Sequence, residues 1–175
     1  MTIAIVGTAG RDSSQPLTRA LWDWMLLDAK KRVPIGAHLV SGGAAWADHL
    51  AVALYLDNWA SRLRLHLPAP FASGKFSTGF YTRTSASAAN WYHERFSRIV
   101  GFDSLSELRT ALTLCDYTYE PFSNGYKGMS DRNTKVALAD ELLAYTFGDM
   151  PTGGTLDTWN KCLGTRTHIS LDRRQ

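Results

Sequence analysis

Short apolar segments alternate with amphipathic segments along the first part of the chain. Residues 2–6, 37–40 and 62–67 (TIAIV, AHLV and RLRLHL) predict three strands. Between them, apolar residues recur at helical spacing from residue 17 to 30 and from residue 45 to 58. Strands and helices in this order predict right-handed βαβ units on a parallel sheet.

The pattern weakens from residue 71 to 127 and then returns. Helices are expected at about 88–99, 105–114 and 131–139, and further strands at 142–145 and 168–171, with a helix ending at Cys162 between those two strands. We therefore predict a single domain, residues 1–175, with a modified Rossmann-like three-layer α/β/α fold and a mostly parallel sheet. A helical and loop insertion is expected at about 71–128. Its mixture of basic and aromatic residues fits a lid, a dimer interface or plain packing.

Composition narrows the class of protein. The chain has 175 residues, of which 45% are apolar and 20% charged, as in globular domains. No apolar stretch is long enough to span a membrane, so we expect a cytoplasmic protein. The net charge of +3 is spread along the chain, which makes nucleic acid an unlikely partner. Two cysteines and five scattered histidines give neither a disulfide framework nor a metal site, and no cofactor is expected.

Three glycine turns are the main candidates for a ligand-binding site. Each is expected to follow a strand and begin a helix, so all three should lie at the carboxyl edge of the sheet, where ligands of parallel α/β proteins bind. Glycine lets the backbone approach an anion, and the following helix offers unpaired N–H groups. Hydroxyl groups in the turns could donate further bonds. The turn residues are Gly7, Thr8, Gly10 and Arg11; Ser41, Gly42 and Gly43; and Gly153, Gly154 and Thr155.

The first turn matches neither of the two common phosphate-binding motifs. Residues 7–11 (GTAGR) lack the lysine of a P-loop and the third glycine of the dinucleotide fingerprint. ATP hydrolysis and NAD-dependent hydride transfer are therefore poorly supported.

Four short motifs together resemble the SLOG superfamily. They are IVGTAGR (5–11), SGGAAWAD (41–48), DRN (131–133) and GGT (153–155). That superfamily includes YpsA-like proteins, the LONELY GUY or "lysine decarboxylase-like" phosphoribohydrolases, and DprA-like domains. The resemblance covers about 1–70 and 129–171 and is closest to the short YpsA-like members.

The resemblance implies a site for a nucleotide or nucleotide-derived ligand. Gly42, Gly43 and the 153–155 turn would hold phosphate, with Asn133 beside them, and Asp48 would support the second turn. Arg132 would lie over the phosphate or ribose. We expect Arg132 at a helix start, where a cation is disfavoured unless it binds an anion or pairs with a neighbouring carboxylate, Asp131 or Asp149. The family's second-turn glycine is replaced at Ala45 or Trp46, and the indole could stack on a base or simply pack.

The catalytic half of the family motif is altered. Phosphoribohydrolases carry a glutamate three residues after their Gly-Thr pair, and that position is Thr158 here. Asp157 lies one position early and points about 100° away on a helix. Arg132 and Asp157 are therefore only weak catalytic candidates. Carboxylates of the insertion could replace the glutamate, namely Glu94, Glu107, Asp116 and Glu120.

Two functions follow as hypotheses. The first is a homo-oligomeric sensor or sequestering module that binds an AMP-like or ADP-ribose-like molecule. The alternative is an N-glycosidase, phosphoribohydrolase or base-exchange enzyme that acts on nucleoside monophosphates.

Overall fold

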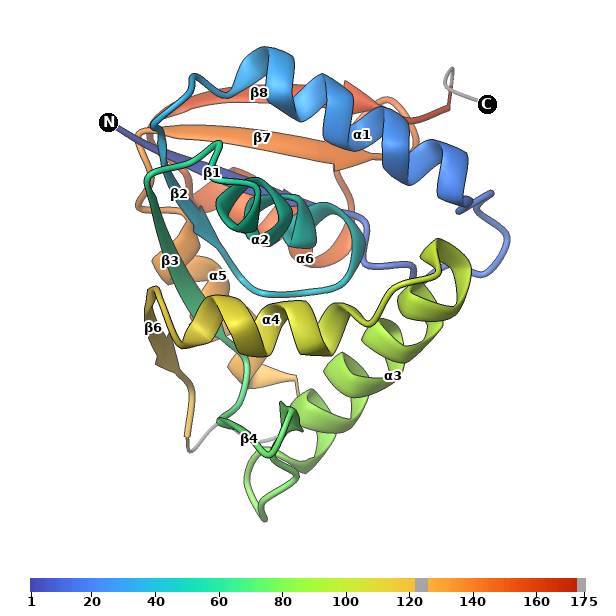
Figure 1. Ribbon diagram of the computed structural model, residues 1–175, viewed down its shortest axis with the longest axis vertical. Coiled ribbons are helices and arrows are strands. Elements are labelled where there is room, and N and C mark those ends of the chain that lie inside the picture. The colour runs from blue at the N-terminus through green and yellow to red at the C-terminus, as the bar shows by residue number, and fades with distance from the viewer. Residues whose placement is uncertain (122–125, 173–175) are drawn as a thin grey trace.

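The protein is built on one six-stranded parallel sheet. The computed structural model describes residues 1–121 and 126–172. The strands are β1 (Thr2–Gly7), β2 (His38–Ser41), β3 (Arg62–Leu67), β6 (Asp116–Tyr119), β7 (Glu141–Thr146) and β8 (Thr165–Ser170). Their order is β6-β3-β2-β1-β7-β8, and every neighbouring pair is parallel (Figure 1).

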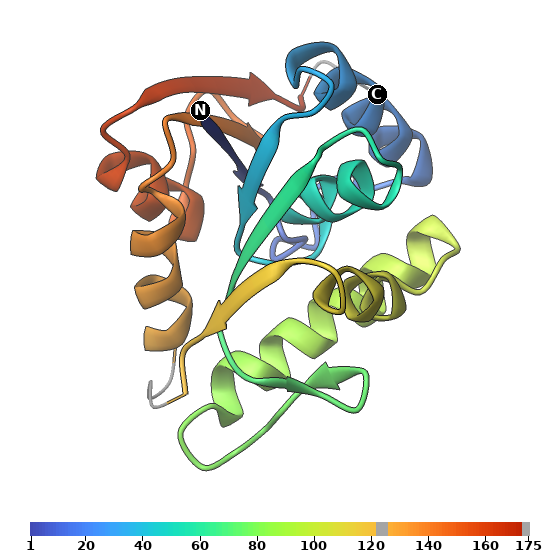
Figure 2. The same ribbon diagram turned by 60° about the vertical axis from the view of Figure 1, so that its left-hand side comes forward.

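Helices cover both faces of this sheet. They are α1 (Arg19–Arg32), α2 (His49–Leu56), α3 (Arg83–Val100), α4 (Ser104–Leu112), α5 (Lys127–Val136) and α6 (Gly153–Lys161), with a 3₁₀ turn, η1 (Trp46–Asp48), before α2. Alternate residues of β1 supply the two cores. Ile3 and Ile5 pack with α1 to α4, whereas Ala4 and Val6 pack with Val136 of α5 and its neighbours. Figure 2 shows the two helical layers on opposite sides of the strands, which confirms the predicted three-layer α/β/α fold.

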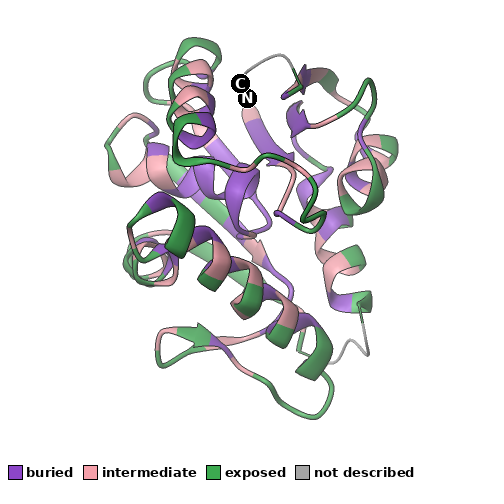
Figure 3. Cartoon of the chain, turned by 90° about the vertical axis from the view of Figure 1, so that its right-hand side faces the viewer, coloured by how far each residue is buried: buried purple, intermediate pink, exposed green. Residues whose placement is uncertain are grey.

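The chain reverses its direction of travel across the sheet at β1. From β1 it moves outward through β2 and β3 to β6, and then returns to form β7 and β8 on the other side of β1. The connections after β1 and β7 therefore leave the sheet on either side of a topological switch point, the place where parallel α/β sheets bind ligands. The central strands β1, β2 and β7 are buried beneath helices whose outer faces are exposed (Figure 3).

The predicted elements agree with the structure in the regular parts of the chain. Strand β3 has the predicted bounds, and β1, β2 and β7 are within a residue or two. The insertion differs most. It contains a small hairpin, β4 (Phe71–Ala72) and β5 (Lys75–Phe76), and the strand β6, which extends the main sheet. Strand β6 was not predicted because its sequence, DYTY, is too short for its alternation of tyrosine with polar residues to stand out, and all four residues are exposed in the structure. Residues 122–125 lie outside the described part.

Helix α5 also differs from prediction, since it begins at Lys127 rather than near residue 131. Its first turn has no apolar stripe that periodicity could detect. Across the described ranges, no helix combines the length and apolar character that crossing a membrane requires.

Candidate functional site

A cavity of about 340 Å³ lies at the switch point, and we call it the switch-point cavity. Its size falls within the range of about 300–1,000 Å³ that is typical of small-molecule sites. Eleven of the thirteen predicted binding residues line it: Gly7, Thr8, Arg11, Gly42, Gly43, Asp48, Arg132, Asn133, Gly153, Gly154 and Thr155. Ser41 and Gly10 do not. The fold thus brings the three glycine turns and the Arg-Asn pair together from distant parts of the sequence.

The first turn is held against β7. The Thr8 N–H donates to the Tyr145 carbonyl at 2.9 Å, and a Cβ on Gly7 would lie only 2.0 Å from that oxygen. The Thr8 hydroxyl donates to Oε1 of Gln15 at 3.3 Å and accepts from the N–H of Gly10. Arg11 is exposed at the cavity wall, with its guanidinium 5.7 Å from the ring centre of Tyr126.

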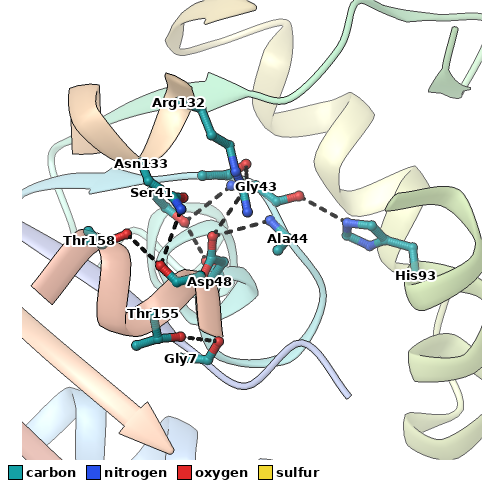
Figure 4. Close-up of polar contacts among 12 residues, drawn as sticks. Gly7, Ser41, Gly43, Ala44, Asp48, His93, Arg132, Asn133, Thr155 and Thr158 are labelled. Carbon is teal, nitrogen blue, oxygen red and sulfur yellow. Dashed lines mark hydrogen bonds and ion pairs between the residues drawn. The ribbon is translucent and has the colours of Figure 1, made fainter. Parts of the chain in front are cut away.

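The second turn is closed by its own side chains. The Ser41 hydroxyl donates to the Asp48 carbonyl at 2.9 Å and accepts from the N–H of Gly43 at 3.4 Å. The N–H of Ala44 donates to the Asp48 carboxylate, also at 3.4 Å. On the outer side, Nε2 of the buried His93 lies 3.0 Å from the Gly43 carbonyl. The donors expected to face a ligand here are therefore already used within the protein (Figure 4).

Arg132 lies in the middle of α5, so the prediction that it begins a helix was wrong. Its Nη1 donates to the Gly42 carbonyl and lies 3.6 Å from Oδ2 of Asp48, which is its ionic partner instead of the expected Asp131 or Asp149. Both side chains are about nine-tenths buried, with 11% and 8% exposed. Nε of Arg132 is buried without a hydrogen-bond partner among the described residues.

Burial dominates the electrostatics of this pair. It raises the pKa of Asp48, although the positive charge of Arg132 and N–H donors of the turns oppose that shift. Burial also lowers the pKa of the Arg132 guanidinium, against the stabilising charge of Asp48. A guanidinium that is desolvated and only partly satisfied binds a further anion favourably.

The third turn is open. Thr152 precedes α6 in an extended conformation, but its side chain makes no capping hydrogen bond. Gly153 and Gly154 are exposed at the cavity wall. Because the first N–H groups of a helix have no partner within the helix, this end of α6 offers donors to an anion. The Thr155 hydroxyl is not among them, since it donates to the Gly7 carbonyl at 3.0 Å.

The carboxylates predicted from the insertion do not reach the cavity. All four have partners elsewhere: Glu94, Asp116 and Glu120 form ion pairs with Arg98, Arg64 and Lys135, and Glu107 lies 2.8 Å from Nε2 of His49. Asp157 is also absent from the lining and binds Lys161 and Asn133 at 2.9 and 3.2 Å. Among the described residues, the carboxylates that line the cavity are Asp12 and Asp48.

Thr158 occupies the glutamate position of the phosphoribohydrolases and lines the cavity. It is buried, and its hydroxyl donates to the Gly154 carbonyl at 3.2 Å. The hydroxyl therefore completes the turn of α6.

The apolar part of the lining was missed by sequence reasoning. Ala89 and Tyr92 of α3 form one wall, and Tyr126, Met129 and Phe147 form others. These residues gave no signal because side chains of this kind are as common in cores as in sites. Helix α3 gives the insertion a direct place in the site, whereas the sequence left its role open between lid, interface and packing.

Trp46 packs in the core instead of facing the cavity. It is 1% exposed, and its ring lies 4.7 Å from that of Phe96. Its φ of +60° is in the left-handed region that favours glycine. Throughout residues 1–121 and 126–172, no cluster of three or more His, Cys, Asp or Glu side chains is placed to hold a metal ion.

Comparison with known proteins gives one close relative. No protein-family model matches the chain, and no solved structure does. A protein of Acanthamoeba polyphaga mimivirus, "Uncharacterized protein R261", is 33% identical over 171 residues, which cover 91% of this chain and 89% of the viral protein. Similarity at this level over nearly the full length of both chains places this protein in the same family as the mimivirus protein.

Proposed function

We propose that the protein binds a nucleotide or nucleotide-derived small molecule in the switch-point cavity, as a sensor or sequestering module. The observation that carries the proposal is the convergence of three glycine turns and Arg132 on one cavity of ligand size. Topology alone brings the turns of neighbouring parallel strands to one edge, and the further observation is that a cavity of ligand size opens between them with Arg132 in its lining. The resemblance to the SLOG superfamily points the same way.

The phosphate of such a ligand belongs at the third turn. The uncapped start of α6 supplies N–H donors, and the partial positive charge of a helix N-terminus favours an anion there. Arg132 lines the same cavity with a buried Nε that lacks a partner among the described residues. A phosphate oxygen in reach of both would satisfy that nitrogen by a charge-assisted bond.

The rest of the cavity suits a base and a ribose. Tyr92, Tyr126, Met129 and Phe147 offer apolar and aromatic surface. Aromatic faces of this kind stack on nucleobases without demanding one particular base. The left-handed φ of Trp46 coincides with the glycine of the family's second-turn motif, which supports the resemblance at the level of backbone conformation.

A binder fits the site better than a glycosidase does. The glutamate position is Thr158, and Asp157 lies outside the cavity. The alternative, an N-glycosidase or base-exchange enzyme on nucleoside monophosphates, would have to use Asp48 or Asp12. Asp48 is the better placed, because it is buried beside Arg132, whereas Asp12 is exposed.

The deciding experiment incubates excess protein with nucleoside mono-, di- and triphosphates, deoxynucleotides and ADP-ribose. The ultrafiltrate and the material released by denaturing the retained protein are analysed by mass spectrometry. A ligand that leaves the filtrate and returns intact supports the binder. Release of free base and sugar phosphate by the wild-type protein, but not by Asp48→Asn, supports the N-glycosidase. A panel that stays entirely in the filtrate contradicts both.

A pair of substitutions at the helix start tests where the phosphate lies. Thr152 already has the extended backbone of an N-cap residue, so Asp and Asn both fit there and stabilise α6. Thr152→Asp adds a negative charge at the phosphate position and should weaken binding tenfold or more relative to Thr152→Asn. Equal affinities in the two variants would move the phosphate away from α6.

We also retain the proposal that the protein is a cytoplasmic homo-oligomer. Exposed aromatic side chains of the insertion, Phe80 and Trp91 among them, provide surface of the kind that interfaces use. Light scattering on the purified protein tests it, and a monomeric mass at micromolar concentration would contradict it.

A further inference from the structure

A second, smaller cavity adjoins the switch-point cavity. It encloses about 160 Å³, and we call it the second compartment. Four residues line both cavities: Ala9, Asp12, Gln15 and Tyr92. The second compartment is completed by Gly10, Ser13, Leu17, Trp46, Arg95 and Ile99. It therefore lies where the loop after β1 runs beside the C-terminal half of α3 (Figure 1).

The size of the second compartment suits part of a ligand. It is smaller than the roughly 300–1,000 Å³ of sites that hold a whole small molecule. At about 30 Å³ per water molecule it has room for about five waters, which is comparable to one sugar ring. A molecule that fills the main cavity and extends past Asp12 and Tyr92 would place such a ring there.

The polar groups at the junction are of the kind that binds hydroxyl groups. Oδ1 of Asp12 accepts from the N–H and hydroxyl of Ser14, but Oδ2 has no partner within the described ranges. Gln15 accepts from Thr8 through Oε1, and its amide nitrogen is likewise without a described partner. Both residues line both cavities, and a free carboxylate oxygen and a free amide donor there match the donors and acceptors of sugar hydroxyl groups.

Arginine side chains in the lining of the two cavities would favour a ligand whose linking group is anionic. Arg11 lines the main cavity, and Arg95 lines the second. Arg95 lies over the Trp91 ring at 4.6 Å and makes no ion pair among the described residues. Each compartment thus has a cation in its lining for a diphosphate that extends from the start of α6 toward the second compartment.

We propose that the second compartment binds a sugar ring joined through a diphosphate to the nucleotide in the main cavity. The ligand class is then a nucleoside diphosphate sugar rather than a nucleoside mono- or diphosphate. This inference rests on the proposed function, because the nucleotide part must occupy the switch-point cavity. Asp12 and Gln15 would bind the sugar hydroxyls, and Leu17 and Ile99 would contact the ring.

The test compares matched ligands that differ only in the sugar. Affinities are measured by calorimetry for ADP, UDP and GDP and for ADP-ribose, UDP-glucose and GDP-mannose. Two hydrogen bonds to the sugar predict that at least one sugar form binds tenfold or more tightly than its diphosphate. If every diphosphate that binds has the same affinity as its sugar form, the second compartment does not bind a sugar, and the proposed function still stands. No binding in any pair would overturn both.

Filling the second compartment sharpens the test. Ile99 is partly exposed and lines this compartment alone, so Ile99→Trp places an indole where the sugar would lie. The ratio of sugar-form to diphosphate affinity should fall to about one. Arg98→Trp is the matched control, because Arg98 is exposed on the same helix and lines neither cavity. An unchanged ratio in Ile99→Trp would place the sugar elsewhere.

Discussion

The second and third glycine turns look alike in sequence and differ in the folded protein. Each places a Gly-Gly pair between a strand and a helix. At the second turn the glycines are buried, and side chains of Ser41 and Asp48 take up N–H groups of the turn. At the third turn the glycines are exposed, and the residue before the helix leaves it uncapped.

The difference comes from one carboxylate. Asp48 lies at the start of α2 and accepts from the turn where an external anion would otherwise bind. The second turn thus carries its own anion, while the third has none. A ligand phosphate is therefore expected at the third turn. Arg132, which pairs with Asp48 at the second turn, lines the same cavity.

The largest expected effect is the loss of that internal anion. Asp48→Ala leaves the Arg132 guanidinium buried without its ionic partner, which costs about 3–5 kcal/mol in the free energy of unfolding. Urea denaturation measures it. Asp23→Ala is the control, because Asp23 pairs with Arg19 at the surface and should cost at most about 0.5 kcal/mol. Similar costs for the two variants would contradict the closed second turn.

The next largest change in stability is expected from alanine substitutions at the glycines themselves. Gly43 has a φ of +67°, and a Cβ there would lie 2.6 Å from Leu67, so Gly43→Ala should destabilise the protein by about 2–4 kcal/mol. A Cβ on Gly154 would meet Asn133 at an ordinary 3.6 Å within a helix. Gly154→Ala should therefore be neutral or stabilise by up to about 1 kcal/mol. Thermal and urea unfolding report both changes, and the reverse order would refute the comparison.

Much of this arrangement could be predicted from the sequence, but the difference between the turns could not. Apolar runs that end in glycine identify β1 and β2 because buried parallel strands have that composition. Their common edge then follows from topology. The closure of the second turn depends on where the Ser41 and Asp48 side chains point, and the ionic partner of Asp48, Arg132, is far away in the sequence. Periodicity carries no information about such pairs.

Two further failures have the same kind of cause. The start of α5 was placed too late because its first turn is polar and packs little apolar surface, and this misplaced Arg132 on the helix. The apolar wall from α3 was missed because Ala89 and Tyr92 resemble core residues until the tertiary structure turns them toward the cavity.

His93, which contacts the Gly43 carbonyl of the second turn, should also make the free energy of unfolding depend on pH. Burial lowers the pKa of His93 from 6.5 to about 3, and nearby His49 and Arg132 further disfavour a positive charge. The unfolded chain binds this proton below pH 6.5 while the folded protein does not, so stability is complete above pH 6.5 and falls as the pH falls toward 3. One proton corresponds to about 1.4 kcal/mol per pH unit.

His93→Gln removes this proton while keeping a donor for the Gly43 carbonyl. The slope of unfolding free energy against pH, measured between pH 4.5 and 6, should therefore decrease by about one proton. His66→Gln should give a decrease of the same sign, because the pKa of His66 is lowered to about 4, chiefly by burial. A wild-type slope in His93→Gln would show that His93 is not held neutral.

The smallest effect concerns the contact that joins the third turn to the first. Thr155→Val keeps the shape of the side chain and removes its bond to the Gly7 carbonyl, which should cost about 1 kcal/mol of stability. Thr134→Val is the control, since its hydroxyl donates at 3.4 Å within an exposed turn of α5 and should cost a few tenths at most. If the two variants unfold at the same urea concentration, the Thr155 bond does not fix the open turn. A larger loss for Thr155→Val means that the Thr155 hydroxyl holds this exposed, uncapped turn in place. The N–H groups of the turn then remain available to a ligand.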